Sequence, residues 1–372
     1  EIDTIPAIDG KDIHTSLDLK SQQVAFRELK NRRGSVVAVD ISDGAIVTYL
    51  SSPSFSVNKI ANGLSQNDFN ELIEDKNKPF FDRAAQGRYS PASTIKPAIG
   101  LFGLENNIID WDFTIDDPGY FELPEDGRIY RGWKKGGHGK INLQDAIIES
   151  SNTFFFSLAY KSEIEELIKH LSYFGFGRNV CLDCFLPDNG LLPDPAWKMN
   201  TLNFGWFKGD TVNLGVGQGY MSATPLQLAY YSAFIANKGA LNKFSFVQDD
   251  KTLPKDVFYS GNIDDKDWEK IHKSMIGVIE QPKGTAGRLR ELKDYIIAAK
   301  SGTVELVSTD TKEDYKIIRE EEAKRDHAII VAFGPMPNPK YAVSVVIENG
   351  ESGGSVAGPV AIEVLNSLLD YE

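Results

Sequence analysis

The sequence predicts an α/β fold of the α+β type, in which one antiparallel sheet is flanked by helices and joined to a helical subdomain. Three observations predict it: β-branched runs lie near both ends of the chain, residues 60–231 are mostly helical in pattern, and loops rich in Gly, Pro and Asp interrupt that helical segment. Because the faces of a sheet must be covered, strands at both ends with helices between them favour one sheet closed by the two ends of the chain.

The first elements are a short strand at residues 13–19 and a helix at residues 20–30. In this helix we expect Val24, Phe26 and Leu29 to face the core. No other periodic signal is clear before residue 34.

A hairpin follows and is the strongest local signal. Residues 35–40 and 45–50 are β-branched runs, and Ser42-Asp43-Gly44 joins them. Asp-Gly between two such runs is typical of a tight hairpin turn.

The rest of the chain changes from helices to strands. The clearest helices of the middle segment are at residues 92–104, 143–160 and 225–237. Strands are predicted at residues 295–303, 327–334 and 341–348, and a helix at residues 357–369 closes the sheet. The charged stretch at residues 305–326 is predicted to stand off the sheet as a solvated excursion.

Composition limits the possible functions. The 372 residues are 41% apolar and 25% charged, which is typical of a globular protein. Forty basic against 53 acidic residues give a net charge of −13, which disfavours nucleic acid as a partner. No apolar run approaches the ~18 to 20 residues that a bilayer span needs. The chain is therefore expected to be a soluble protein or the soluble part of a longer one.

Cys181 and Cys184 form a C-x-x-C pair. A redox pair should open a helix after a strand, whereas a Gly-rich turn precedes this pair and Pro187 follows it. A zinc site would need two more ligands. We favour two small residues buried in a loop or strand, with a local disulfide as the second interpretation.

The candidate chemistry begins with Ser93-Thr94-Ile95-Lys96, because five His residues leave little scope for a Ser-His-Asp triad. If Ser93 opens the helix, Lys96 lies one turn later on the same face, where its amine can reach the Ser93 hydroxyl. The helix N-terminus offers free N–H groups where negative charge would develop. Burial beside other cations would lower the pKa of Lys96, as a base requires.

Two further elements follow in order. Ser150-Ser151-Asn152 is an S-x-N element beside a helix, and Lys300-Ser301-Gly302-Thr303 is a K-S-G element in an apolar strand. Each short motif alone is weak, since S-x-x-K recurs at residues 56–59 and S-x-N at residues 56–58 and 65–67. The ordered set matches the serine acyl-transfer motifs of β-lactamases and penicillin-binding proteins.

With these motifs the chain resembles the transpeptidase domain of a class B penicillin-binding protein over nearly its whole length. Other segments typical of the class are residues 34–40 with Gly44, 83–87, 89–93, 209–211, 217–219, 224–227 and 284–286. Ala92 stands where Gly is more usual. Residues 117–119 and 130–139 are most similar to the penicillin-binding protein 2 subfamily, the elongation enzymes of rod-shaped Gram-negative cells.

The resemblance implies a penicillin-binding, serine β-lactamase-like transpeptidase fold and a D,D-transpeptidase that cross-links peptidoglycan stem peptides. By resemblance, Ser93 is the nucleophile that attacks the D-Ala-D-Ala carbonyl, and Lys96 is the base that takes its proton. Ser150 relays that proton, and Asn152 orients Lys96 and the substrate amide. β-Lactams, which mimic the donor peptide, are expected to acylate Ser93.

The resemblance also assigns the K-S-G strand. Lys300 supplies positive potential, and the hydroxyls of Ser301 and Thr303, on either side of Gly302, bind the terminal carboxylate of the substrate. The backbone N–H groups of Ser93 and Thr303 form the oxyanion hole.

The resemblance further implies domains and partners. Residues 1–33 would be the remnant of a linker to an N-terminal pedestal and membrane anchor, and residues 34–372 the transpeptidase domain. The native protein would sit in the bacterial inner membrane with this domain in the periplasm. A SEDS-family glycosyltransferase and a rod-shape scaffold protein are expected to bind mainly through the missing N-terminal region.

Some members of the subfamily hold zinc before the S-x-N motif, on two Asp, one His and one Cys. The matching positions here are Asp117, Gly132, His138 and Ser151. Two ligands do not hold a structural zinc, so we predict no metal and no cofactor.

Other residues have simpler interpretations. We expect Ser151 to cap a helix, His138 to donate to backbone from a loop, and Asp210 and Gln218 to support the fold. Trp133 and Tyr220 are expected to form core or cleft wall.

Two competing functions share the same motifs. A serine β-lactamase needs a base aimed at a deacylating water, and we find no convincing candidate. A non-catalytic β-lactam sensor would keep the same residues but signal through extra segments, and none is visible.

Overall fold

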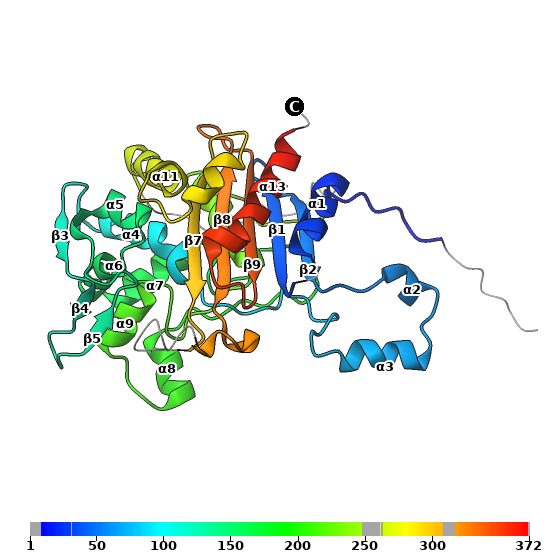
Figure 1. Ribbon diagram of the computed structural model, residues 1–372, viewed down its shortest axis with the longest axis horizontal. Coiled ribbons are helices and arrows are strands. Elements are labelled where there is room, and N and C mark those ends of the chain that lie inside the picture. The colour runs from blue at the N-terminus through cyan, green and yellow to red at the C-terminus, as the bar shows by residue number, and fades with distance from the viewer. Residues whose placement is uncertain (1–8, 31, 248–260, 262, 308–316, 371–372) are drawn as a thin grey trace, which may run out of the picture.

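The computed structural model describes residues 9–30, 32–247, 261, 263–307 and 317–370, and a five-stranded antiparallel sheet stands at its centre (Figure 1). Its strands are β1 (Gly34–Asp40), β2 (Ile46–Ser52), β7 (Ala298–Val304), β8 (His327–Gly334) and β9 (Tyr341–Ile347), in the order β2-β1-β9-β8-β7. β1 pairs with β9 from Gly34 opposite Ile347 to Asp40 opposite Tyr341. One antiparallel sheet closed by both ends of the chain is therefore confirmed, as is the predicted hairpin.

Helices cover both faces of this sheet. The front face in Figure 1 carries α1 (Leu19–Leu29), α13 (Gly358–Leu369) and the single π-helical turn η4 (Gly353–Ala357). The opposite face carries α10 (Pro225–Ala236), while α11 (Asp265–Glu280) packs against β7. The α10 contact includes two buried hydrogen bonds, from Ser232 Oγ to the Ala332 carbonyl at 3.0 Å and from Ser344 Oγ to the Pro225 carbonyl at 2.6 Å. Because both faces are covered, β8 is an almost continuous apolar run.

A helical half lies beside β7 (Figure 1). Its helices are η1 (Ala92–Ile95), α4 (Lys96–Glu105), α5 (Leu143–Ile148), α6 (Asn152–Tyr160), α7 (Ile164–Tyr173), α8 (Pro195–Leu202) and α9 (Lys208–Leu214). It also holds two small sheets, β3 (Thr114–Asp117) with β6 (Gly139–Asn142) and β4 (Tyr120–Glu122) with β5 (Ile129–Arg131). Shorter elements are α2 (Val57–Ala61), α3 (Gln66–Glu74), η2 (Gly287–Glu291) and η3 (Glu322–Lys324); α2 and α3 extend away from the sheet.

Two predictions for the N-terminal segment are wrong. Residues 13–19 form no strand, because only Thr15 makes an isolated bridge, with Val247, and α1 begins at Leu19 with Asp18 as its cap. Phe26 is 56% exposed, whereas Val24 and Leu29 are buried as expected. Ser21, Val24, Ala25 and Leu29 form the buried face of α1, and Phe26 lies off that face.

The helix predicted at residues 143–160 is two helices. Ser150 has a φ of 59°, in the left-handed region that few residues other than Gly adopt, and this conformation separates α5 from α6. Ser151 then caps α6 by accepting a hydrogen bond from the Phe154 N–H, as predicted. The break places the S-x-N motif at the start of a helix.

Cys181 and Cys184 form a disulfide, so the second interpretation of this pair holds in place of the favoured one. Their Cα atoms lie 5.6 Å apart across a turn, within bonding range for a disulfide. The turn is fixed by Asp183, whose carboxylate accepts hydrogen bonds from the N–H groups of Phe246 and Val247.

The charged stretch is solvated only in part. Residues 308–316 lie outside the described residues, and residues 317–325 are exposed or half-buried. Asp326, by contrast, is 7% exposed, and its carboxylate accepts a hydrogen bond from the Leu306 N–H at 3.2 Å.

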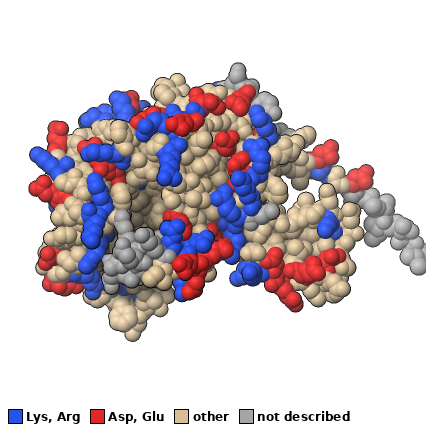
Figure 2. All heavy atoms as spheres, viewed as in Figure 1, with Lys and Arg blue, Asp and Glu red and all other residues tan. Residues whose placement is uncertain are grey.

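On the face shown in Figure 2, basic and acidic side chains are interspersed, so the net negative charge forms no single acidic patch there. Among the described residues, no helix combines the length and apolar character that crossing a bilayer requires.

Candidate active site

Ser93 lies in η1, directly before α4, and is partly exposed. Pro97 occupies the first turn of α4, where its missing N–H costs little. Ala92 has a φ of 47°, which explains why Gly is the more usual residue at this position, and its N–H donates to the Gly217 carbonyl at 2.9 Å. These constraints hold the Ser93 hydroxyl at the surface, above a buried helix.

The Lys96 amine is fully buried and is held by the S-x-N element. Its Nζ lies 2.8 Å from the Ser150 carbonyl, 2.7 Å from Asn152 Oδ1 and 3.2 Å from Ser150 Oγ. None of these hydrogen bonds goes to Ser93, so the contact expected between Lys96 and the Ser93 hydroxyl is replaced by contacts with Ser150 and Asn152. These three oxygens all belong to the S-x-N element, and together they fix the position of the amine.

Electrostatics favour a neutral Lys96. Burial lowers the pKa of this amine well below its ordinary value, the charge of Lys300 lowers that pKa further, and Asp117 offsets part of the shift. A neutral amine has a lone pair and can accept a proton.

Lys300 approaches the same loop from β7. Its buried Nζ lies 3.0 Å from Ser150 Oγ and 3.1 Å from the Ser301 carbonyl. Burial lowers the pKa of Lys300 to about 7. Ser150 Oγ is therefore shared by two buried amines, one from the first motif and one from the third.

The rest of the K-S-G strand lies at the edge of the sheet. A Cβ on Gly302 would come within 3.1 Å of Thr94 Cγ2 and 3.2 Å of the Pro91 carbonyl, so glycine lets β7 pack closely against η1. Ser301 Oγ lies 2.9 Å from Thr285 Oγ1, and Thr303 is partly exposed. The structure thus brings together Ser93, Lys96, Ser150, Asn152, Lys300, Ser301, Gly302 and Thr303.

A second buried hydrogen-bond network, centred on Asp117, supports the S-x-N element through Ser151. Asp117 Oδ2 lies 2.6 Å from His138 Nδ1 and accepts a hydrogen bond from Ser151 Oγ at 2.7 Å, while Asp117 Oδ1 accepts from the Gly119 N–H at 2.7 Å. Burial raises the pKa of Asp117, but the hydrogen bonds from Ser151, His138 and Gly119 outweigh it, so the net pKa lies below its usual value. The prediction that His138 donates to backbone is wrong, because its Nδ1 pairs with this carboxylate.

The same network tests the zinc expectation. Of the four matched positions, Gly132 has no side chain, and Ser151 uses its hydroxyl to donate to Asp117 and to cap α6. Only Asp117 and His138 keep a side chain of the expected ligand type, and they are hydrogen-bonded to each other at 2.6 Å. These residues do not fit a structural zinc site, which needs four ligands.

Trp133 is a contact that the sequence analysis missed. Its Nε1 donates to the Ser150 carbonyl at 3.1 Å, beside the Lys96 amine, and its ring lies edge-on to His138 at 5.8 Å. Trp133 was expected to form core or cleft wall, and it lies on the loop between β5 and β6; its hydrogen bond to Ser150 was not predicted. Asp210 supports the fold as predicted, because its carboxylate holds Lys198 Nζ at 2.6 Å.

Comparison with known proteins decides the family. A family model described as the penicillin binding protein transpeptidase domain matches residues 34–366. The chain belongs to the penicillin-binding protein transpeptidase family. The resemblance drawn from the motifs is thereby confirmed.

Peptidoglycan D,D-transpeptidase MrdA of Acinetobacter baumannii is 39% identical over 369 residues, which cover 97% of this chain and 54% of that protein. The chain spans about half the length of this curated relative.

Solved penicillin-binding proteins share the fold. Pseudomonas aeruginosa PBP2 in complex with WCK 5153 has a TM-score of 0.89 and 36% identity, covering 97% of this chain and 79% of that one. Helicobacter pylori PBP2 in complex with MreC has a TM-score of 0.86 and 31% identity, covering 96% and 64%. The predicted transpeptidase fold is confirmed.

Proposed function

We propose that this chain is the catalytic part of a peptidoglycan D,D-transpeptidase of cell-wall elongation, which cross-links stem peptides through an acyl-enzyme on Ser93. The observation that carries the proposal is the buried hydrogen-bond chain from Lys300 through Ser150 to Lys96, set beside Ser93 in a transpeptidase family. Nucleophilic serine catalysis needs an adjacent base whose pKa is lowered, and Lys96 meets that need.

In the first half-reaction, neutral Lys96 takes the Ser93 proton as Ser93 Oγ bonds to the carbonyl carbon of the penultimate D-Ala. The C–N bond then breaks, and the terminal D-Ala leaves as its amine receives a proton from Lys96 through Ser150. In the second half-reaction, the neutral amine of a neighbouring stem attacks the ester carbonyl and loses a proton to Lys96. The ester C–O bond then breaks, Ser93 Oγ takes that proton back from Lys96, and the new amide is the cross-link. Asn152 Oδ1 keeps the Lys96 amine aimed at the reacting atoms through both halves.

The proposed oxyanion hole consists of the backbone N–H groups of Ser93 and Thr303, and such a donor contributes roughly 3 kcal/mol in other acyl enzymes. The close packing of Gly302 on η1 supports it, because this contact brings β7 alongside the Ser93 turn. The hydroxyls of Ser301 and Thr303 would bind the terminal carboxylate of the donor peptide, and Lys300 would supply positive potential. A penicillin presents the same carboxylate and carbonyl, so it would acylate Ser93.

A β-lactamase needs a base aimed at a deacylating water, and in class A enzymes that base is a Glu. The acidic residues next to the S-x-N loop are already engaged: Asp117 binds His138 and Ser151, and Glu149 lies within 3.4 Å of Lys134 and 3.2 Å of Lys283. This arrangement supports slow deacylation and therefore the transpeptidase.

The proposed setting follows from the relatives. We propose that residues 34–372 form the transpeptidase domain, that residues 1–33 belong to a linker, and that a longer native protein is anchored in the inner membrane with this domain in the periplasm. We also propose a rod-shape scaffold protein as a partner, and the H. pylori PBP2 complex with MreC supports this proposal. A SEDS-family glycosyltransferase is the second proposed partner.

Intact mass spectrometry after addition of a penicillin tests the function. We expect a lasting adduct of one drug molecule on the wild type and none on Ser93→Ala. Drug consumption without a lasting adduct would establish a β-lactamase instead. Neither adduct nor consumption would contradict the assignment of Ser93 as a nucleophile.

A further inference from the structure

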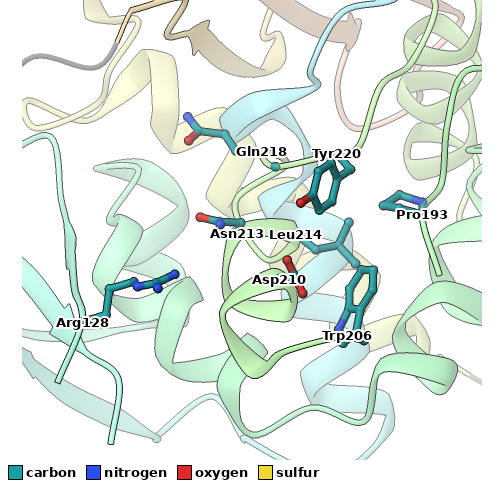
Figure 3. Close-up of a pocket in the computed structure, with 9 residues that line it drawn as sticks. Arg128, Pro193, Trp206, Asp210, Asn213, Leu214, Gln218 and Tyr220 are labelled. Atoms are coloured by element: carbon teal, nitrogen blue, oxygen red, sulfur yellow. The ribbon is translucent and has the colours of Figure 1, made fainter. Parts of the chain in front are cut away.

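A polar cavity of about 350 Å³ lies in the helical half of the protein and has no role in the steps above (Figure 3). Arg128, Trp206, Asn213, Gln218 and Tyr220 are among its lining residues. Figure 3 shows Asn213 on α9, between Arg128 of the turn joining β4 and β5 and the ring of Tyr220. Its volume lies in the range of small-ligand sites.

The cavity is tied to the Ser93 turn. The Gly217 carbonyl accepts hydrogen bonds from the Ala92 N–H and from Ser90 Oγ, and residues 218–220 continue from Gly217 into the cavity wall. A Cβ on Gly217 would also clash with the Ala92 backbone. α9, which carries Asn213, packs on α6, whose first residue is Asn152. Two elements of the proposed catalytic centre, the Ser93 turn and α6, therefore contact segments that line this cavity.

The polar groups of the cavity have few partners within the protein. The side chains of Asn213, Gln218 and Tyr220 form no hydrogen bond within the described part of the chain, although all three line the cavity. Gln218 supports the fold through its backbone, because its N–H donates to the Asn213 carbonyl at 3.0 Å, and its side chain adds no hydrogen bond to that support. Groups so placed are available to hydrogen-bond a ligand.

The charge of the cavity favours an anion. Asp210 also lines it, but its Oδ2 lies 2.6 Å from Lys198 Nζ and accepts the Phe207 N–H at 2.7 Å, so this carboxylate is neutralised by its own neighbours. Within the residues that the structure describes, the one charged partner of Arg128 is Asp126, at 3.8 Å, and the Arg128 side chain is 67% exposed. A guanidinium in this position suits a carboxylate, and the two carboxamides suit peptide N–H and C=O groups.

We propose that this cavity binds the acceptor stem peptide, a short peptide with a free amine and free carboxylates; this inference rests on the proposed function. The carboxylate pairs with Arg128, and the peptide groups pair with Asn213 and Gln218. The donor peptide reaches the Ser93 turn from β7, where Gly302 meets Pro91 and Thr94, whereas the cavity reaches it through Gly217 and Ala92. Because the donor and acceptor peptides would approach the Ser93 turn along different contacts, both can be present when the acceptor amine attacks the acyl-enzyme.

The test separates the two peptides by filling the donor site first. Each protein is acylated with a penicillin, and its full conversion is verified by intact mass. A synthetic stem tetrapeptide with a free side-chain amine is then titrated in, and its Kd is measured by calorimetry. We expect Arg128→Ala and Gln218→Ala each to raise the Kd at least fivefold. The matched control is Arg131→Ala, an exposed arginine on β5 of the same hairpin, which should leave the Kd within twofold of wild type.

The ligand provides an independent check. A tetrapeptide with amidated carboxylates should bind the wild type more weakly, and Arg128→Ala should bind the two peptides equally. Absence of binding to the acylated wild type, or the same Kd for wild type, Arg128→Ala and Gln218→Ala, would overturn the inference. Failure of the wild type to acylate at all would instead overturn the proposed function.

Discussion

Lys300 and Ser150 are joined by a 3.0 Å hydrogen bond from a buried amine to a hydroxyl oxygen. That oxygen has one proton and also lies 3.2 Å from Lys96 Nζ. When Lys96 is neutral, Ser150 donates to it; when Lys96 is protonated, Lys96 donates to Ser150. A proton gained from Ser93 therefore reverses one hydrogen bond, while Lys300 holds the Ser150 oxygen in place.

Removal of the shared hydroxyl tests this relay. We expect Ser150→Ala to slow acylation by penicillin about 100-fold, in the range of general acid–base effects, while binding before acylation changes little. Stopped-flow acylation measures both quantities. The control is Ser162→Ala, a buried serine whose hydroxyl donates to the Leu158 carbonyl, and it should acylate like wild type. Equal rates for both variants would contradict the relay.

The pH profile of acylation should depend on Lys300. Its pKa of about 7 means that its charge is present below pH 7 and is lost as pH rises through that value. The acylation rate with a carboxylate-bearing penicillin is therefore expected to fall above pH 7. In Lys300→Arg the side chain stays charged, so this alkaline decline should disappear even if the maximal rate is lower. An unchanged decline in Lys300→Arg would assign it to another group.

The buried charge of Lys300 should also lower the free energy of unfolding. Its pKa is about 7 in the folded protein and about 10.4 in an unfolded chain, so between these values the unfolded state binds more protons and stability rises with pH. Below pH 7 the buried charge is present and the penalty is complete. We expect Lys300→Met to be about 1–4 kcal/mol more stable than wild type at pH 6. Urea unfolding from pH 6 to 10 measures this, and the difference should shrink as pH rises.

Ser151 should matter to both stability and rate. Ser151→Ala removes the cap of α6 and the hydrogen bond to Asp117, and caps typically contribute about 1 kcal/mol. We expect a loss of about 2 kcal/mol and slower acylation, because the neighbours Ser150 and Asn152 lose support. Ser65→Ala removes the exposed cap of α3 and serves as the control. A comparable slowing in Ser65→Ala would show that the effect is not local.

Metal removal should change nothing. Because His138 and Ser151 are both hydrogen-bonded to Asp117, we expect less than stoichiometric zinc by elemental analysis of purified protein. Treatment with a chelator should leave the melting temperature and the acylation rate unchanged. One bound zinc per chain, together with a lower melting temperature after chelation, would contradict this expectation.

Much of the architecture was predictable because its signals are local. The Asp43-Gly44 turn predicted the hairpin, and the β-branched runs predicted β8 and β9 to within a residue. That the three motifs lie near one another was predictable because they sit at fixed points on these elements, which are a helix start, a helix cap and an edge strand.

Other features depend on tertiary structure. The apolar pattern continues through residues 143–160, so the break at Ser150 shows only in its positive φ. The strands of the two small sheets have three or four residues each, too few for a period. Trp133 meets the Ser150 carbonyl across a long loop, and no spacing predicts that contact.

The pairing of β1 with β9 has a consequence for biosynthesis. The first strand of the sheet emerges from the ribosome long before its partner, and β9 and β8 separate β1 from β7 in the finished sheet. Such distant pairing makes folding slow and leaves strand edges open to aggregation in the meantime. Reactivity toward penicillin should therefore appear only late in synthesis, once β8 and β9 have been made, and nascent chains that stop before β9 should be unreactive.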